Sequence, residues 1–445
     1  MIRLISTHPN ANRSSILRLC AVLLLGLLTA PVISAQEVAD TIKIRTRVVF
    51  MDALVKDKKT GIPISDLKPE NFELFDDGKP RTISYFTREG QARKPLALIL
   101  ILDCREDGAG RFLKQPEVIQ AITEQLSKLP PGDEIGIMAM NIGEDEQRIW
   151  LTHFTNNAAE IAAALARVPA FVDSPYITAA ENQKSQKENQ PKKDNGSLSI
   201  GVNTDGNDGR EAKASASQTT PNPEVASTET IKGKSGAVIT RTTMKDGSVN
   251  VKRVNSKGNV TLEVNDIYDM AAAVREATQS AEQERPNSQP AIVWLSDGIA
   301  PIFYEDRDAT QQILIRSNAT FSSLTTDLRT LFKFLMPIGK PLAGWLGVSL
   351  YGSAKYLAQQ TGGEALRVNR TRDYGTGLAK IIGNLTARYS LGFALAEDEK
   401  DDGRMHELAI RVKARDEKGK ERKLDVSSRR GYFVPRTDGE QAAVK

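Results

Sequence analysis

The stretch LILILDCREDGAGRF, from Leu98 to Phe112, decides the fold of this chain. Its first part, Leu98 to Asp103, is an uninterrupted apolar run that ends on a carboxylate. Such a run is typical of a strand that is buried on both faces of a sheet. The loop that follows carries a cysteine, an arginine and two further acidic residues. In open α/β sheets, function lies at the carboxyl ends of the strands, so this loop is the first candidate site.

The sequence around this stretch alternates between strand-like and helix-like segments. The alternation runs over 93–172 and resumes over 261–388, where AIVWLSDG, ending at Gly298, is a second apolar strand. This pattern predicts an α/β domain in two parts, with a mostly parallel sheet and helices on both faces.

The two ends of the chain are predicted to be β-rich. Residues 36–92 and 389–436 show strand alternation with Asp-Gly and Lys-Gly turns, and 437–445 is a short tail. Because isolated sheets of two or three strands are marginal, we expect 389–436 to pair with 36–92 in one β-sandwich-like unit.

The α/β pattern is interrupted by an insert over 173–260. Up to about Gly233 the insert is rich in Asn, Gln, Lys, Ser, Thr and Gly, a composition that cannot bury enough surface to offset the entropy of ordering. Its last part alternates and contains Asp246-Gly247, which is compatible with a protruding hairpin. We expect most of the insert to be disordered.

The N-terminus has the layout of a secretory signal. Basic residues precede an apolar run from Cys20 to Ala35, which predicts that 1–35 is a signal peptide. The alternative, a retained anchor, is disfavoured because the run is shorter than the ~20 residues that span a bilayer. We therefore expect an exported protein, periplasmic or extracellular, with no membrane span after cleavage. Cys104 is then its only cysteine, which excludes an internal disulfide.

The charge balance says little in favour of a nucleic-acid partner. The 445 residues include 60 Lys and Arg against 56 Asp and Glu, a net charge of +4. A balance this even provides no strong basic field, so no nucleic acid is expected as a partner.

Taken together, the strand ending in Asp103, the loop and helix after it, and the later strand ending in Ser296-Asp297-Gly298 resemble a von Willebrand factor type A domain. The flanking stretches DLKPENFELFDDGKP, ARYSLGFAL and SSRRGYF resemble an exported bacterial subgroup, the VWFA-related domain proteins. The resemblance implies a Rossmann-like fold and a role in protein binding.

The family's metal-ion-dependent adhesion site uses Asp-x-Ser-x-Ser after the first strand, a Thr ahead of the third helix and an Asp after the fourth strand. By this resemblance, Asp103 matches the first aspartate and Asp297 the later one, while Arg105 and Asp107 stand at the two Ser positions. An arginine has no acceptor atom and keeps its positive charge, so Arg105 cannot be a metal ligand. The resemblance therefore implies a degenerate site.

Two arrangements of this site remain open. In one, Arg105 neutralises the two strand-end aspartates through charge-assisted hydrogen bonds, and no cofactor is bound. In the other, Arg105 points to solvent, and the aspartates, Asp107 and the residue at the Thr position, Asn265 or Asp266, form an oxygen-rich pocket for Mg²⁺.

Other motifs for catalysis are scarce. His8, His153 and His406 are the only histidines, and no spacing among them suggests a zinc site. Gly347 to Tyr351 lacks the second glycine of a nucleophile elbow, and there is no phosphate-binding P-loop. Cys104 is compatible with a reactive thiolate or with a small semi-buried residue, and no histidine partner can be named for it.

The stretch from Leu331 to Tyr351 is apolar and contains two prolines and a tryptophan where a short connection would suffice. It fits either a loop folded over the core or a surface that binds a partner.

Two classes of function follow from these observations. The favoured class is an exported, non-enzymatic binding or assembly protein whose partner is another protein of the cell envelope. The alternative is an envelope enzyme, hydrolytic or redox, that uses Cys104 or the acidic loop. An enzyme of that kind needs a base beside a nucleophile, and the sequence shows none.

Overall fold

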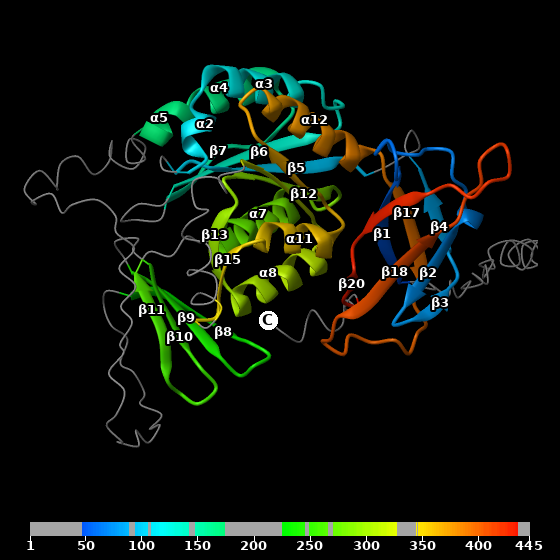
Figure 1. The fold of residues 1–445 in the computed structure, drawn as a ribbon. Helices are drawn as coiled ribbons and strands as arrows, with labels where there is room; N and C mark the ends of the chain where they lie inside the picture. The colour runs from blue at the N-terminus through cyan, green and yellow to red at the C-terminus, as the bar shows by residue number, and fades with distance from the viewer. Residues whose placement is uncertain are drawn as a thin grey trace, which may run out of the picture. The chain divides into compact units, whose positions relative to one another are not determined.

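The computed structural model of the chain describes residues 47–88, 94–105, 108–141, 147–173, 225–244, 249–265, 270–326, 344 and 346–434. These residues form a central α/β unit, a β-sandwich and a smaller antiparallel sheet (Figure 1). The expected signal peptide, the tail, Asp107 and Asp266 lie outside the described residues.

A six-stranded sheet forms the centre of the α/β unit, in the order β16-β14-β12-β5-β6-β7. Neighbouring strands are parallel except at the edge, where β7 runs antiparallel to β6. All eight residues of β5, Leu96–Asp103, are buried, as its apolar run predicts for a strand covered on both faces. The other strands are β6 (Glu134–Asn141), β7 (Gln147–Thr155), β12 (Gln289–Ser296), β14 (Thr320–Thr326) and β16 (Ala365–Val368).

Helices cover both faces of this sheet (Figure 1). Alternate side chains of β5 enter separate core clusters, with Leu98 and Leu100 in one and Ile99 and Ile101 in the other. The helices on one face are α2 (Gly110–Leu113), α3 (Pro116–Leu126), α4 (Ala158–Ala166), α5 (Val168–Asp173) and α12 (Asp373–Thr386). Those on the other are α7 (Met270–Glu284), α8 (Tyr304–Arg316) and α11 (Ser353–Thr361).

Strands from the two ends of the chain form the β-sandwich. One sheet has the order β19-β1-β17-β4 and the other β20-β18-β2-β3. β1 pairs with β17 and β19, and β2 pairs with β18, all antiparallel, around a shared apolar core. The expected fold class, an α/β unit with a β unit built from the terminal strands, is confirmed. The strands are β1 (Val48–Asp57), β2 (Phe72–Asp76), β3 (Lys79–Arg81), β4 (Tyr85–Thr87), β17 (Tyr389–Ala394), β18 (His406–Val412), β19 (Leu424–Ser428) and β20 (Gly431–Tyr432).

Arginines of the C-terminal motifs join the sandwich to the α/β unit. Arg388 donates to the carbonyl of Gly362 at 2.8 Å, and the backbone N–H of Arg430 donates to the carbonyl of Gln360 on α11 at 2.9 Å. A Cβ at Gly362, whose φ is +76°, would lie 2.6 Å from the backbone of Ser428, so only glycine allows this approach. The stretches ARYSLGFAL and SSRRGYF therefore have a structural role at this junction.

The second half of the insert forms more structure than the hairpin indicated by its sequence. Residues 225–265 contain an antiparallel sheet, β11-β10-β9-β8, while 174–224 lie outside the described residues. Apolar side chains on one face of this sheet pack against Phe303 and Leu346, so burial outside the insert supplies what its own composition lacks. The strands are β8 (Val225–Lys232), β9 (Val238–Met244), β10 (Val249–Val254) and β11 (Val260–Asn265).

The apolar stretch 331–351 is described only at Gly344 and from Leu346 onward. Leu346 is buried, and β15 (Val348–Tyr351) pairs with β13 (Ile299–Phe303). Whether the stretch binds a partner therefore stays a prediction. Among the described residues, every helix is too short or too polar to cross a bilayer.

Candidate functional site

Two adjacent strands deliver the polar groups of the candidate site. β5 and β12 run parallel, with Leu102 paired to Leu295, so Asp103 and Ser296 reach the same level of the carboxyl edge. Asp297 follows directly. Gly298 then takes a φ of +77°, a left-handed conformation that favours glycine, and the chain turns into β13.

The guanidinium of Arg105 lies between the two aspartates. Its Nε donates to Asp103 Oδ1 at 2.9 Å and its Nη2 to Asp103 Oδ2 at 2.6 Å, which is a bidentate pair. The same Nη2 donates to Asp297 Oδ1 at 2.7 Å. One side chain therefore bridges the ends of two strands, although Arg105 and Asp297 are 192 positions apart in the sequence.

Ser296 completes the contact between the strands. Its hydroxyl donates to Asp103 Oδ2 at 2.7 Å and accepts the backbone N–H of Gly298 at 3.2 Å. Sequence reasoning treated Ser296 only as the end of a strand. The feature of the sequence that could have identified Ser296 as a site residue is its hydroxyl side chain directly before Asp297, on a strand that also ends at the carboxyl edge.

The ion pair is almost entirely removed from water. The exposed fractions of the side chains are 0% for Asp103, 2% for Asp297 and 12% for Arg105. Buried charges are tolerated only when they are paired and hydrogen-bonded. Two carboxylates against one guanidinium leave these three side chains with one net negative charge.

Gly108 and Gly110 lie close to the ion pair. The backbone N–H groups of Gly108 and Gly110 donate to the Arg105 carbonyl at 3.1 and 2.8 Å. A Cβ at Gly108 would lie 2.8 Å from Asp297 Oδ2, and a Cβ at Gly110 would lie 2.5 Å from the Arg105 carbonyl oxygen. Both positions therefore need glycine for the loop to approach this closely.

Tyr374, near the start of α12, is part of the same environment, and sequence reasoning missed it. Its hydroxyl shares a hydrogen bond with the hydroxyl of Thr326, at the end of β14. Burial, followed by the negative charges of Asp103 and Asp297, raises the pKa of Tyr374 to about 12. The phenol is therefore neutral at physiological pH.

Cys104 is fully buried although it follows the strand end directly. Burial, and then the charge of Asp103, raises the pKa of its thiol well above the ordinary value. Because the thiolate is the reactive form, these surroundings do not suit a nucleophile or a redox-active cysteine.

The remaining predicted ligands are not brought to the ion pair by any described contact. Asn265 is the last residue of β11 and pairs through its backbone with Asn250, but its side chain is not among the described ones. Asp107 and Asp266 lie outside the described residues. A metal site built from Asp103, Asp297 and these residues stays a prediction.

No family model and no curated protein matches the sequence. Solved structures that resemble the chain include an aerotolerance-related membrane protein from Bacteroides fragilis, crystallised with multiple mutations to serines. The identity is 10% and the TM-score 0.29, covering 65% of this chain and 98% of that one. BatB, a conserved hypothetical protein from Bacteroides thetaiotaomicron, is 10% identical with a TM-score of 0.30, over the same shares of the two chains. A von Willebrand factor type A protein from Catenulispora acidiphila is 8% identical with a TM-score of 0.34, and the match covers 89% of this chain and 76% of that one.

All three TM-scores are below 0.5, so neither activity nor partners pass from those proteins to this chain. The resemblance to the type A domain is confirmed for the fold. It is visible in the chain's own sheet order, in its two helical layers and in the two aspartates at the carboxyl edge of β5 and β12.

Proposed function

We propose that this chain is an exported, non-enzymatic binding or assembly protein that engages another protein through the carboxyl edge of its central sheet, without a bridging metal. The observation that carries the proposal is the position of Arg105, whose guanidinium bridges Asp103 and Asp297. Export is proposed from the sequence of residues 1–35 alone.

The described donors do not fit a hard divalent cation while Arg105 holds this position. Mg²⁺ requires near-octahedral oxygen ligands at about 2.0–2.1 Å. Arg105 Nη2 lies 2.6 and 2.7 Å from one oxygen of each aspartate, which is where a shared cation would have to bind. Both oxygens of Asp103 already accept hydrogen bonds from the guanidinium. We therefore propose no metal cofactor for this site.

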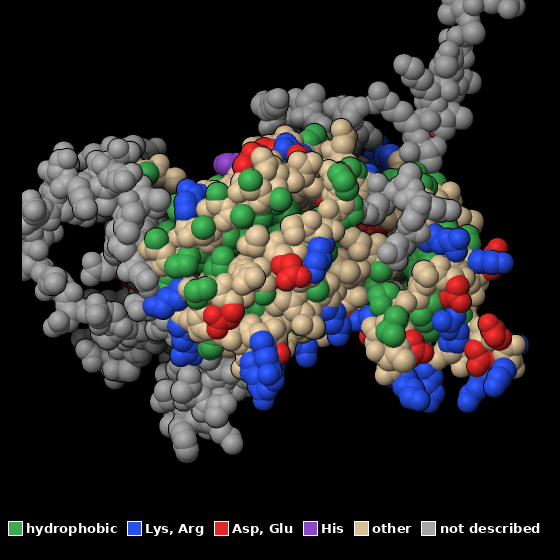
Figure 2. Space-filling model, turned by 90° about the horizontal axis from the view of Figure 1, so that it is seen from above, with side chains coloured by type: hydrophobic (Ala, Val, Ile, Leu, Met, Phe, Trp, Pro, Cys, Tyr) green, Lys and Arg blue, Asp and Glu red, His purple; other side chains and the backbone are tan. Residues whose placement is uncertain are grey.

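The exposed groups at this edge suit a protein partner. The loop after β16 presents Arg370 and Arg372 at the carboxyl end of the sheet, and the side chain of Arg372 is 71% exposed. Figure 2 shows the side of the molecule that carries α3, α4 and α12, where acidic and basic side chains both lie among apolar and uncharged ones. The helical face seen in Figure 2 is therefore of mixed charge, which favours a protein partner over a polyanion such as nucleic acid for this molecule.

The enzyme alternative has less support. The buried Cys104 with its raised thiol pKa lacks the properties of a nucleophile. The two described histidines are each engaged by a carboxylate, His153 by Glu284 at 3.0 Å and His406 by Asp77 at 3.1 Å.

Capture from an envelope extract tests the proposal, with the full chain lacking residues 1–35 as bait. We expect a partner that is retained equally in Mg²⁺ and in a chelator. Arg370→Glu combined with Arg372→Glu should abolish the capture, because both substitutions reverse charge at the carboxyl edge. The matched control is Lys128→Glu, an exposed charge between α3 and β6 at the opposite edge of the sheet, which should still capture the partner.

Three results would contradict the proposal. One is a partner that is lost in the chelator, which would restore a bridging metal. Another is equal loss in Lys128→Glu, which would place the binding surface elsewhere. The third is turnover of a substrate by the purified chain.

A further inference from the structure

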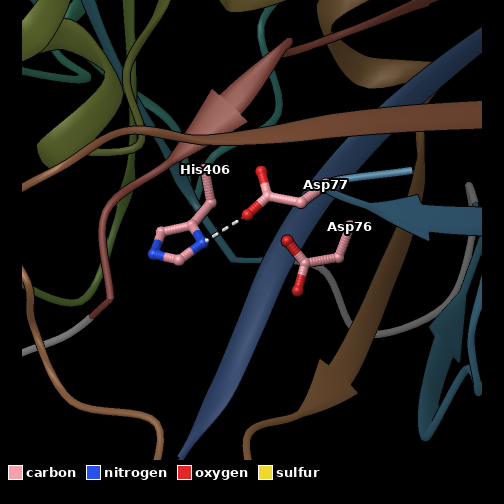
Figure 3. A group of neighbouring side chains, drawn as sticks. All are labelled: Asp76, Asp77 and His406. Carbon is pink, nitrogen blue, oxygen red and sulfur yellow. Dashed lines mark hydrogen bonds and ion pairs between the residues drawn. The ribbon is translucent and has the colours of Figure 1, made fainter. Parts of the chain in front are cut away.

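Asp76, Asp77 and His406 bring their side chains together at one end of the β-sandwich (Figure 3). Asp76 ends β2, Asp77 begins the turn to β3 with a φ of +47°, and His406 begins β18, which pairs with β2. One potential ligand atom from each residue lies within 4.8 Å of the other two. The group joins an N-terminal strand of the sandwich to a C-terminal one, because Asp77 and His406 are 329 positions apart.

Asp76 offers a buried oxygen that has no hydrogen-bond partner among the described residues. Its side chain is 4% exposed. Oδ2 accepts from Arg81 Nη2 at 2.7 Å and from the hydroxyl of Tyr432 at 3.2 Å, but Oδ1 accepts nothing. Leaving a buried carboxylate oxygen unsatisfied is costly, and bound cations are one common reason for it. In Figure 3 this carboxylate faces the space beside His406 and Asp77.

The imidazole of His406 is held between two carboxylates. Its Nδ1 lies 3.1 Å from Asp77 Oδ2, and its Nε2 lies 3.5 Å from Asp402 Oδ1, within ion-pair distance but without hydrogen-bond geometry. The ring also packs against Tyr432, with the ring centroids 5.1 Å apart. These contacts fix the orientation of the ring, which is what a metal-binding histidine requires.

The charges around the imidazole do not balance. Four acidic side chains lie near two guanidinium groups around this imidazole, so acidic groups outnumber basic ones by two. Although burial raises the pKa of Asp77 and of Glu399, hydrogen bonds outweigh it and lower both pKa values overall. The backbone N–H of Arg404 is the main cause that lowers the pKa of Asp402. The carboxylates are Asp76, Asp77, Glu399 and Asp402, and the guanidinium groups are Arg81 and Arg404.

We propose that Asp76, Asp77 and His406 bind a first-row divalent transition metal, for which Zn²⁺ is the best match. One imidazole nitrogen and two carboxylate oxygens are ligands of Zn²⁺, whereas Mg²⁺ and Ca²⁺ prefer oxygen alone.

The separation of two of the ligand atoms is close to what this ion requires. Zinc–ligand bonds of about 2.0–2.2 Å in a tetrahedron place two ligand atoms about 3.3–3.6 Å apart, and His406 Nδ1 and Asp77 Oδ2 are 3.1 Å apart, so a small movement of these side chains admits the ion. The ion replaces the hydrogen bond between these two atoms and takes up the free oxygen of Asp76. With the metal on Nδ1, the ring proton is on Nε2, which faces Asp402. That carboxylate then acts as the outer partner that orients the ligand.

A bound ion would cross-link the β2–β3 hairpin to β18, and so the N-terminal to the C-terminal strands of the sandwich. Reasoning from the sequence missed it, because the spacing among the three histidines indicates no zinc site. The stretch NFELFDDGKP was singled out only for its resemblance and its Asp-Gly turn. The ligands meet only after the two ends of the chain have paired.

Titration of the chelator-treated full chain with Zn²⁺, and with Co²⁺ as a spectroscopic probe, tests the proposal. We expect one equivalent of saturable binding, visible d–d absorption with Co²⁺, and a rise in Tm with Zn²⁺. His406→Ala should weaken the affinity at least 100-fold. Asp77→Asn should also weaken it, because an uncharged amide oxygen binds Zn²⁺ less strongly than a carboxylate, and it preserves the turn because asparagine tolerates the left-handed conformation of this position.

The matched control is His153→Ala, which removes the other described histidine–carboxylate pair and should leave Zn²⁺ affinity unchanged. Absence of saturable binding in the wild-type chain would overturn the proposal, and the cluster would then be an ion-pair network only. An affinity that is unchanged in both His406→Ala and Asp77→Asn would overturn it equally. So would displacement of the ion by a modest excess of Mg²⁺.

Discussion

Replacement of Arg105 by alanine is the most direct test of the candidate site. The substitution removes the guanidinium that pairs with Asp103 and Asp297 and leaves two buried carboxylates side by side, with side chains 0% and 2% exposed. Removing one partner of a buried ion pair costs about 3–5 kcal/mol. For a cooperative unit of 150–250 residues, a loss of this size corresponds to a fall in Tm of about 6–20 °C. Calorimetry on wild type and variant measures it.

The pH dependence of the loss of stability in Arg105→Ala separates the effect of the lost charge from the effect of the lost packing. In Arg105→Ala the folded state favours uptake of a proton by one of the adjacent carboxylates, so the folded state binds more protons than the unfolded chain. Stability of the variant should therefore rise as the pH falls from 7 toward 5. Arg105→Met combined with Asp103→Asn and Asp297→Asn removes the charges together and should recover part of the loss.

Arg372→Ala is the control for loss of an arginine. Its side chain is 71% exposed and lies 3.9 Å from Asp373, so the change in stability should stay within about 1 kcal/mol. A loss in Arg105→Ala that is no larger than this, with no dependence on pH, would refute the view that the bridge holds the two strand ends together.

Three further outcomes are expected. Arg105→Ser combined with Asp107→Ser returns both hydroxyls of the family pattern and removes the fixed cation, so it should create Mg²⁺ binding, seen as a gain of about 2.7 kcal/mol at 100 times the Kd. Wild-type protein that binds Mg²⁺ at micromolar concentration would instead overturn the metal-free proposal. Replacing residues 176–222 by a short Gly/Ser linker should change Tm little, since loop closure costs only ~0.6 kcal/mol per doubling of length; a chain that fails to fold would show that the segment supplies packing. Arg241→Ala should lower the free energy of local unfolding of the β8–β11 sheet, measured by hydrogen exchange, by about 3 kcal/mol. The substitution breaks a buried ion pair, because the side chains of Arg241 and of Asp306 on α8 are 8% and 5% exposed. Lys252→Ala, which removes an exposed pair in the same sheet, should leave hydrogen exchange there unchanged.

The sequence by itself determined the elements and the layers. The apolar run of β5 required a strand covered on both faces, and the alternation of strands and helices required helices on both sides. Asp103 and Asp297 were placed at the same edge of the sheet because both follow apolar strands. Such inferences succeed because hydrophobic periodicity is local, and burial then acts on each element in the same way.

Only the tertiary structure decided which side chains meet. The direction of Arg105 depends on a carboxylate 192 positions away, and no local pattern distinguishes a guanidinium turned inward from one turned to solvent. Tyr374 joined the site because α12 packs beside β14 and β16, and the β8–β11 sheet formed because Phe303 and Leu346 cover it. Asp77 and His406 meet because the two ends of the chain pair in one sandwich. The physical reason is common to all four cases: each contact depends on partners that the packing of segments distant in the sequence brings close, so the position of each group follows from the fold as a whole.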